Sequence, residues 1–464
     1  MIKPWKHQKE GVKYIKNKDG ILYAWGMGSG KTIGTLHAAM EINAKTILII
    51  TPKSVLTVWE QEVNKFAQNE FEIKAFITGS VKKKTEQIDL FLKQTSRKRK
   101  IVVINYESAW REGLGEIRVK RRITNIGLLR SINWDMIILD EAHKICRSTS
   151  NISKFCGRLS QSAKKRLALS GTPLPNGCLS AHGMFRFLEP EIFGTSEYRF
   201  RMRYAIYGGF EGRQVIEYVN QEDFKKRYSS ITHQVKTRDV VELPEVSHIE
   251  VLCDLSAKAM KQYNEFKNEC ILDIANSVIT AENVLVKTLR LSQMASGCVT
   301  DEEGTSHIID TSKVDAVSET IEGIDDDEPI VVFGRFRAEI DSLALKLEKN
   351  KITHSFLIGG RNELIDWQQG KTRVLVVNIQ SGALGIDCTR AKYTLYMSTG
   401  YNYANYDQSL ARTCRPGADV NKKLFYYHFN ARNTIDHTVS QAMIRKENLI
   451  DTILNDLYRF KQTT

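Results

Sequence analysis

The chain lacks several features that would place it outside the cell or in a membrane. Its 464 residues include eight scattered cysteines and no C-x-x-C pair, which argues against a disulfide framework and a cysteine-rich zinc site. No apolar run approaches the length of about 18 residues that a membrane helix needs. The first residues, MIKPWKHQKEG, are too polar for a signal peptide. We therefore expect a reduced, cytosolic protein without membrane contact.

The composition is that of a globular protein with a basic surplus. Hydrophobic residues make up 42% and charged residues 26% of the chain, and its length is sufficient for about two to four domains. The 67 Lys and Arg exceed the 54 Asp and Glu by 13. Such a surplus favours nucleic acid as a partner. A generally basic surface without such a partner explains the composition equally well.

One glycine-rich run organises the first half of the sequence. It follows the apolar segment 20–25 and precedes the helix-compatible segment 33–40, so we predict a strand, a tight loop and a helix. Such a loop directs backbone N–H groups at a phosphate, with Lys31 reaching the β- and γ-phosphates and the Thr32 hydroxyl binding Mg²⁺. The strict pattern has glycine at position 25, where this chain has Trp25; the alternative is a glycine-rich turn with an incidental lysine. The predicted nucleotide-binding residues of this run are Gly26, Met27, Gly28, Ser29, Gly30, Lys31 and Thr32.

Gln8 lies about twenty residues upstream of this loop. A glutamine amide both donates and accepts hydrogen bonds, so it can bind an adenine edge bidentately. Without the loop, Gln8 would be an ordinary surface residue. With the loop, we predict that it binds the base.

An acidic pair ends a later apolar segment. Residues 134–139 predict a buried strand, and Asp140 and Glu141 follow it, where parallel sheets bind ligands. We predict that Asp140 holds Mg²⁺ together with Thr32, and that Glu141 orients and deprotonates the attacking water. An exposed acidic loop is the alternative. A further strand ends in SGTP at 170–173, whose hydroxyls can bond the acidic strand end.

Two kinds of basic segment each have two interpretations, one as a nucleic-acid contact and one without such a contact. The clusters at 82–84, 97–100 and 118–122 are either solvated loops or contacts to a phosphate backbone. In the aromatic and basic stretch within 177–240, Arg199, Arg201 and Arg203 alternate. On a strand, this spacing would place cations on one side to grip phosphates. A small packing subdomain is the alternative.

The second half repeats the α/β pattern. Helices are predicted within 254–297, and strands at 330–334 and 373–377 alternate with helices at 338–349 and 362–369. Near the end, Arg412 and Arg415 stand at i and i+3 of a predicted helix and so share a face. Two guanidinium groups on one face require an anion opposite them.

These motifs together resemble helicase superfamily two, and within it the Swi/Snf-type translocases. The resemblance covers nearly the whole chain. The segments TPKSVLTVWEQEVNKF, INYES and ALSGTPLPN are more similar to that group than to DEAD-box RNA helicases, and the stretch after residue 177 resembles the insertion of the annealing-helicase branch. The chain departs from the Swi/Snf pattern at Ala411 and Ala418.

The resemblance implies an α/β fold of two tandem RecA-like lobes, each a parallel sheet flanked by helices, with helical insertions. Lobe 1 would span 1–240, with the insertion at 177–240, and lobe 2 would span 241–464, with a helical insertion at 250–310. ATP and Mg²⁺ would be the cofactors. Gly385 and Asp387 of lobe 2 would join the nucleotide site, and the implied catalytic residues are Lys31, Asp140, Glu141 and, as arginine fingers, Arg412 and Arg415.

The implied function is that of an ATP-dependent DNA helicase or translocase. With no chromatin-reading module in the sequence, we expect branched DNA as the substrate rather than nucleosomes, and a monomer; protein partners are not predicted. Two alternatives stay open. One is the motor subunit of a restriction or defence nuclease complex, although no nuclease motif is present, and the other is an RNA-stimulated ATPase.

Overall fold

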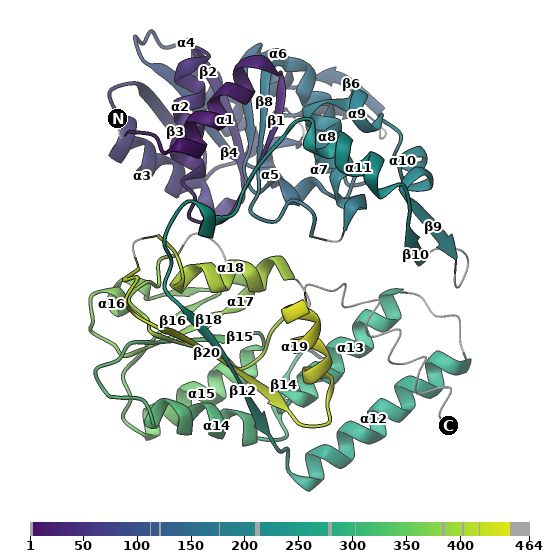
Figure 1. Cartoon of the computed structure of the whole chain (residues 1–464), viewed down its shortest axis with the longest axis vertical. Helices are drawn as coiled ribbons and strands as arrows, with labels where there is room; N and C mark the ends of the chain where they lie inside the picture. Colours follow the sequence, from purple (N-terminus) through teal and green to yellow (C-terminus); the bar gives the residue numbers. More distant parts are fainter. Residues whose placement is uncertain are drawn as a thin grey trace. The chain divides into compact units, whose positions relative to one another are not determined.

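A computed structural model describes residues 3–111, 113–119, 122–175, 177–208, 214–276, 281–301, 303–382, 386–400, 403–416 and 418–445. The chain divides into two compact units, Met1–Val241 and Glu242–Thr464 (Figure 1). Each unit is built on its own sheet of parallel strands with helices packed against it, so the predicted α/β fold is confirmed. No helix among the described residues is both long and apolar enough to cross a bilayer.

Unit 1 contains a seven-stranded sheet in which all neighbouring strands run parallel. Its central strands are apolar runs that are buried along nearly their whole length, as expected when helices cover both faces of a parallel sheet. In spatial order the strands are β11 (Thr232–Val235), β1 (Gly20–Trp25), β8 (Ala163–Leu169), β7 (Trp134–Leu139), β2 (Thr46–Thr51), β4 (Arg99–Asn105) and β3 (Phe71–Ala75).

The helices of unit 1 connect these strands, and two short hairpins project from it. The hairpins are β5 (Glu116–Val119) with β6 (Arg122–Ile126), and β9 (Ala205–Gly208) with β10 (Gln214–Tyr218). The helices are α1 (Lys6–Asn17), α2 (Lys31–Glu41), α3 (Leu56–Ala67), α4 (Val81–Lys93), α5 (Tyr106–Ala109), α6 (Leu128–Ser131), α7 (Asn151–Leu159), α8 (Ala181–Leu188), α9 (Pro190–Phe193), α10 (Glu197–Tyr204) and α11 (Gln221–Ser229).

Trp25, at the position where the strict loop pattern has glycine, is a fully buried core residue. Its ring stacks on Tyr23 with centroids 4.2 Å apart, and its Nε1 donates a hydrogen bond to His233 Nδ1 at 2.8 Å. A Cβ atom added at Gly11 or Gly34 would lie 2.6 or 2.5 Å from the Trp25 ring. The indole therefore fits between α1 and α2 because each helix has a glycine facing it. The departure at position 25 is a change in core packing beneath the loop.

The stretch from α8 to α11 packs its aromatic side chains into the core of unit 1 and is not a separate subdomain. Its aromatic rings contact one another, with Phe193 5.0 Å from Phe200 and stacked on Phe224 at 5.3 Å. The strand predicted for the alternating arginines is wrong. They lie on helix α10, where residues two apart point to different sides.

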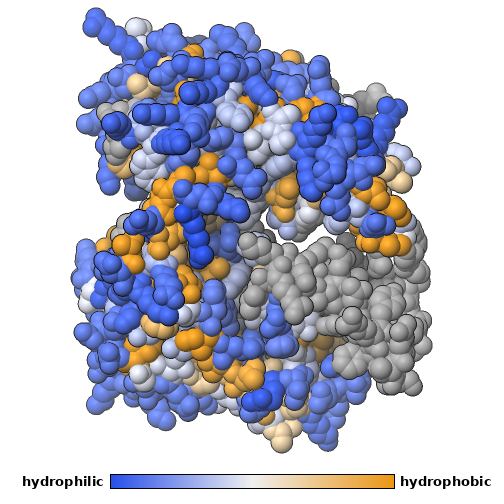
Figure 2. Space-filling view, in the orientation of Figure 1, coloured by the Kyte–Doolittle hydropathy of each residue, from blue (hydrophilic) through white to orange (hydrophobic). Residues whose placement is uncertain are grey.

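Within this stretch, the β9–β10 hairpin exposes apolar side chains. Ile206 and Ile216 are 47% and 67% exposed. Figure 2 shows hydrophobic surface gathered over this hairpin.

Unit 2 contains the second seven-stranded sheet, parallel except at its β16–β17 edge. The sequence interpretation missed its first strand, β12, which pairs with β20 over eight residues before the helical insertion begins. In spatial order the strands are β12 (Val246–Cys253), β20 (Leu424–Ala431), β19 (Tyr393–Tyr396), β15 (Ile330–Gly334), β18 (Val374–Asn378), β16 (His354–Ile358) and β17 (Arg361–Asn362).

The predicted helices of the second half are present. The helices of unit 2 and its hairpin are α12 (Ala257–Asn276), α13 (Ala281–Ala295), β13 (Cys298–Thr300), β14 (Ser306–Ile308), α14 (Ser312–Glu322), α15 (Arg337–Lys349), α16 (Leu364–Gln368), α17 (Ile379–Gly382), α18 (Tyr403–Thr413) and α19 (Ile435–Arg445).

A buried histidine lies on β20, the strand next to the β12 edge of the unit 2 sheet. His428 on β20 stacks on Tyr396 with ring centroids 5.1 Å apart, and its Nε2 lies 3.2 Å from His248 Nδ1 and 3.4 Å from the Tyr406 hydroxyl. Burial, with a smaller contribution from the charge of His248, lowers the pKa of His428 to about 4. The imidazole is therefore neutral at pH 7.

We expect acid to destabilise unit 2 through this residue. The unfolded chain takes up a proton at the ordinary histidine pKa near 6.5, whereas folded His428 does so only near pH 4. The free energy of unfolding should therefore fall as the pH drops from 6.5 to 4, by up to about 3 kcal/mol from this group. Urea unfolding of wild type and His428→Phe across this range measures the effect. Identical pH slopes for the two proteins would contradict it.

Candidate nucleotide-binding site

The predicted phosphate loop connects β1 to α2, as its sequence indicated. Gly28 and Gly30 have φ angles of +75° and +72°, in the left-handed region that only glycine adopts easily. A Cβ atom at Gly30 would also collide with the amide of Gln8. Helix α2 begins at Lys31, directly after Gly30, and the N–H groups of its first turn have no partner within the helix. The loop therefore has the backbone form of an anion site.

Side chains of the loop form hydrogen bonds with carbonyl groups at its start. Lys31 Nζ donates hydrogen bonds to the carbonyl oxygens of Trp25 and Gly26, at 3.0 and 3.1 Å. Ser29 Oγ also donates to Gly26 O, at 2.7 Å. Thr32, the predicted metal ligand, is half-buried at the start of α2. The structure thus brings Lys31 and Thr32 together on one turn.

Helix α1 holds the loop through Gln8 and His7. Gln8 Nε2 donates to Gly30 O at 3.1 Å and to Ser29 O at 3.4 Å, and its Oε1 accepts from Trp5 N at 2.8 Å. His7 Nε2 lies 2.9 Å from Ser29 O, and because a carbonyl only accepts, this nitrogen carries the proton. Gln8 lies at the loop as predicted, but its Oε1 and its Nε2 both form hydrogen bonds with groups of the protein itself. Its contact with adenine stays a prediction, and the His7 contact was not predicted from the sequence.

Asp140, directly after β7, is a buried carboxylate held from several sides. Its Oδ2 accepts from Trp59 Nε1 at 2.9 Å and from Thr51 Oγ1 at 3.1 Å, and its Oδ1 accepts from Glu141 N at 3.0 Å. Burial, and next the charge of Glu141, raise the pKa of Asp140 to about 6, while the hydrogen bond from Trp59, the charge of Lys31 and the bond from Thr51 act in the opposite direction. The three hydrogen bonds fix the orientation of the side chain.

Glu141 has an unusual backbone conformation, with φ +50° and ψ +51°. A residue with a side chain adopts this region at a cost of about 1–2 kcal/mol, and such strain is concentrated at functional sites. Its Oε2 lies 3.3 Å from His143 Nδ1. The Tyr106 hydroxyl donates to the carbonyl of Asp140 at 2.9 Å and so supports the same turn.

The SGTP segment follows β8, which ends at Leu169 and lies between β1 and β7. The predicted bond from its hydroxyls to the acidic strand end is not seen for Thr172, whose buried Oγ1 has no hydrogen-bond partner among the described residues. Ser170 Oγ instead accepts from Thr172 N at 3.2 Å. A Cβ atom at Gly171 would lie 3.3 Å from Met27 Cγ, so this segment contacts the phosphate loop.

The residues predicted in the second half gather in unit 2. Arg415 Nη1 donates to Ile386 O at 3.3 Å, and Cys388 N donates to the carbonyl of Arg412 at 3.0 Å. The prediction that both arginines lie on one helix is wrong, because α18 ends at Thr413 and Arg415 follows it. Both nevertheless border the segment that carries Asp387, whose Oδ1 accepts from Thr389 N and Oγ1. Gly385 lies outside the described residues.

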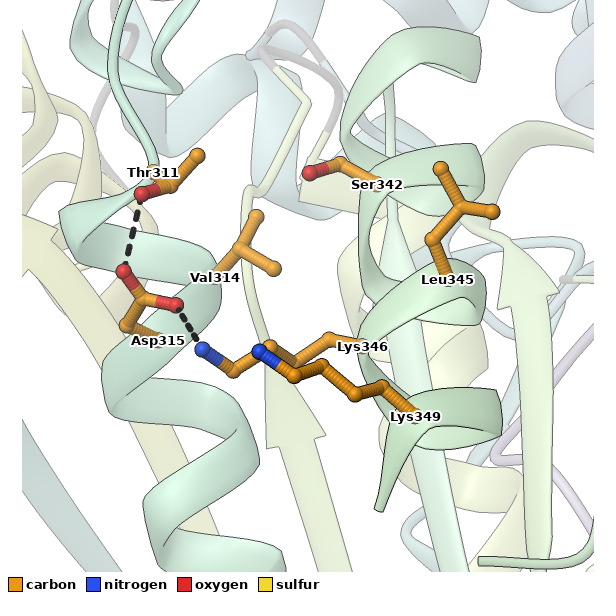
Figure 3. A pocket seen from close by; sticks show the side chains of 7 residues that line it. All are labelled: Thr311, Val314, Asp315, Ser342, Leu345, Lys346 and Lys349. Carbon is orange, nitrogen blue, oxygen red and sulfur yellow. Dashed lines mark hydrogen bonds and ion pairs between the residues drawn. The ribbon is translucent and has the colours of Figure 1, made fainter. Parts of the chain in front are cut away.

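Unit 2 also has a surface hollow of about 280 Å³ between α14 and α15 (Figure 3). Asp315 accepts from Thr311 Oγ1 at 2.8 Å and from Lys346 Nζ at 2.7 Å, and Lys349 lies alongside Lys346. Asp315 therefore pairs with one of the two lysines at this hollow, Lys346. None of the predicted site residues lines it.

Other proteins are similar to this chain over most of its length. An uncharacterized ATP-dependent helicase of Mycoplasma genitalium is 26% identical over 479 residues, which cover 98% of this chain and 43% of the relative. A putative protein, p41, of Acyrthosiphon pisum secondary endosymbiont phage 1 is 24% identical, with 94% of each chain covered. The SWI2/SNF2 ATPase core of Sulfolobus solfataricus, solved in complex with dsDNA, has a TM-score of 0.43 and 21% identity, with 98% of this chain and 93% of that chain covered.

The chain thus spans less than half the length of its Mycoplasma relative. Two family models match it in succession. The SNF2-related domain matches residues 7–300, which include the phosphate loop, Asp140 and Glu141. The helicase conserved C-terminal domain matches residues 312–417, which include Asp387, Arg412 and Arg415. The chain belongs to the SNF2-related family, as its motifs indicated.

Proposed function

We propose that this chain is a DNA-dependent ATPase that moves along DNA. One observation supports the ATPase most strongly. Lys31 follows the strand β1 and Asp140 ends the strand β7, and only β8 separates these two parallel strands. A cationic phosphate loop and a buried carboxylate therefore meet at one edge of the unit 1 sheet, which is the arrangement that nucleotide hydrolysis requires.

The roles of the loop residues follow from their contacts. Lys31 now bonds the carbonyls of Trp25 and Gly26, and we propose that it exchanges them for β- and γ-phosphate oxygens when ATP binds. The exchange replaces bonds to neutral acceptors with stronger bonds to anionic ones. Glu141, placed beside Asp140 by its strained backbone, would accept a proton from the attacking water.

The donor set at this edge fits Mg²⁺ brought in with the nucleotide. Among the described residues, no group of three or more His, Cys, Asp or Glu side chains could hold a metal. One buried carboxylate, Asp140, and one hydroxyl, Thr32, suit a cation that keeps several waters and binds phosphate oxygens. Thr32 and Asp140 would hold the ion, and its charge would neutralise charge that develops on the phosphates.

We further propose, from the resemblance, that Arg412 and Arg415 complete the site from lobe 2. A guanidinium supplied by a second lobe makes hydrolysis conditional on lobe movement. The contacts of both arginines with the segment around Asp387 are consistent with a single functional edge in unit 2.

We expect Glu141→Gln to retain nucleotide binding while its kcat for ATP hydrolysis falls by about 100-fold or more, because only the proton acceptor is lost. Lys31→Ala should instead lose nucleotide binding. Fluorescent nucleotide titration and steady-state ATPase rates separate the two effects, and Glu107→Gln, an exposed carboxylate after β4, is the matched control. An active Lys31→Ala protein would refute the assignment of the loop.

A buried lysine supports DNA as the partner. Lys84, the last residue of the 82–84 cluster, is only 4% exposed, whereas Lys82 and Lys83 are exposed. Its Nζ donates to Ser108 Oγ at 3.2 Å, and no described carboxylate forms an ion pair with it. Burial, and the nearby charge of Lys53, lower the pKa of Lys84. A buried cation without an anion is costly, so a phosphate of the DNA backbone is the ligand that fits here.

Lys53 and Ser108, the neighbours of Lys84, connect the proposed DNA contact to the proposed ATP site. Lys53 follows Thr51 after β2, and Ser108 follows Tyr106 after β4. Thr51 and Tyr106 both bond Asp140, one at its side chain and the other at its carbonyl. A phosphate that draws Lys53 and Ser108 together would therefore act on the two supports of Asp140, which gives DNA a route to stimulate hydrolysis.

We expect Lys84→Met to weaken DNA binding and lower the stimulation of ATPase by DNA, while the rate without DNA is unchanged. The slope of log affinity against log salt should fall by about one, because one phosphate contact is lost. Lys82→Met, one half-turn away on the same helix but exposed, is the control. Equal effects of the two substitutions would contradict a special role for Lys84.

The preferred DNA is proposed from the resemblance to the annealing-helicase branch. We propose branched DNA, as in fork regression, branch migration or strand annealing during replication, recombination or repair, with a monomer acting in the cytoplasm. ATPase and unwinding rates on forks, four-way junctions, plain duplex and single strands at one stated salt concentration test this. A several-fold preference for branched DNA is expected, and equal rates on all of them would exclude it.

Two alternatives to a DNA motor, a subunit of a nuclease complex and an RNA-stimulated ATPase, can be distinguished by experiment. A motor subunit of a defence nuclease complex would co-purify with a nuclease from its host. An RNA-stimulated ATPase would respond to RNA more than to DNA of the same length. No contact in the described residues favours either alternative over the DNA motor.

A further inference from the structure

The last segment of unit 1 returns to the phosphate loop and binds its backbone. Strand β11 pairs with β1, and the ladder continues to Gly26, whose N–H donates to Val235 O at 2.8 Å. Two residues later, Thr237 Oγ1 donates to Met27 O at 2.6 Å. The first two loop residues are therefore held by a segment that is more than 200 positions away in the sequence.

Gly26 is shaped for this contact. It is not among the glycines with positive φ, so its backbone conformation does not require glycine. A Cβ atom at Gly26 would collide with the hydroxyl of Thr237 and lie 2.9 Å from its backbone nitrogen. The glycine is needed here because another part of the backbone approaches closely.

Thr237 also forms hydrogen bonds with the residues that follow it in the chain. Its carbonyl oxygen accepts from Val240 N at 3.1 Å and from Val241 N at 3.0 Å. Val241 is the last residue of unit 1, and unit 2 begins at Glu242. One residue thus holds the phosphate loop with its side chain and the final turn before unit 2 with its backbone.

We propose that Thr237 is a positioning residue that couples the phosphate loop to the segment joining the two units; this inference rests on the proposed ATPase function. When Lys31 leaves the carbonyls of Trp25 and Gly26 for a nucleotide, the backbone next to Met27 O changes its hydrogen bonding. Thr237 transmits that change to Val240 and Val241. Because coupling between two equilibria is reciprocal, the position of the connecting segment then also affects nucleotide affinity.

Hydrogen exchange of the connecting segment tests this coupling directly. In wild type, the non-hydrolysable analogue AMP-PNP with Mg²⁺ should slow exchange of backbone amides in peptides covering 238–245 by about fivefold, the effect of roughly one hydrogen bond. Thr237→Val keeps the size of the side chain but lacks the donor, so it should bind the analogue without this slowing. Thr237→Ser, which restores the hydroxyl, should recover it.

Thr232→Val is the matched control. Its hydroxyl lies on β11, five residues before Thr237, and also donates at 2.6 Å, but to Tyr228 O rather than to the loop. This variant should respond to AMP-PNP as wild type does. A merely structural role for Thr237 would lower the melting temperature of Thr237→Val yet leave the nucleotide response of 238–245 intact, and that result overturns the coupling. A wild-type chain that binds no AMP-PNP overturns the proposed function as well.

Discussion

Parallel pairing in unit 1 is the constraint on which the candidate site depends. Because β1, β8 and β7 run in one direction and in one order, their carboxyl ends lie at the same edge of the sheet. The glycine loop, the SGTP segment and the acidic pair each follow one of these strands. The order of the strands is therefore sufficient to bring together segments that are more than 100 residues apart in sequence. A change of strand order would separate Lys31 from Asp140.

Asp140 is the point at which the other features of this edge converge. Burial alone would favour its neutral form, and the hydrogen bonds from Thr51 and Trp59 and the charge of Lys31 act against that. Tyr106 holds the carbonyl of the same residue. Thr51 ends β2 and Trp59 lies on the following helix α3, whereas Tyr106 lies on α5 after β4. Ser108, on the same short helix as Tyr106, accepts a hydrogen bond from the buried Lys84 of α4. The contacts proposed for nucleotide and for DNA thereby belong to one hydrogen-bonded framework.

The sequence allowed prediction of the parts that depend on local pattern. Apolar β-branched runs located the central strands, and glycine spacing located the loop. Contacts between distant segments were not predictable. Thr237 reaches Met27 across 210 positions, and Lys84 differs from its exposed neighbours only through tertiary packing. For the alternating arginines, the period of two suggested a strand beside the packing alternative, and the structure places them on helix α10, where Phe200 and Tyr204 are buried.

The central claim is that the loop and Asp140 act together on one nucleotide. The most direct test is the affinity of a fluorescent ATP analogue for wild type and Asp140→Asn, measured with and without Mg²⁺. Asparagine keeps an oxygen to accept from Thr51 and Trp59 but has no charge to bind the ion. Our account predicts that Mg²⁺ raises the affinity of wild type alone, and that the two proteins bind equally without it. An equal Mg²⁺ effect in both proteins would contradict the claim.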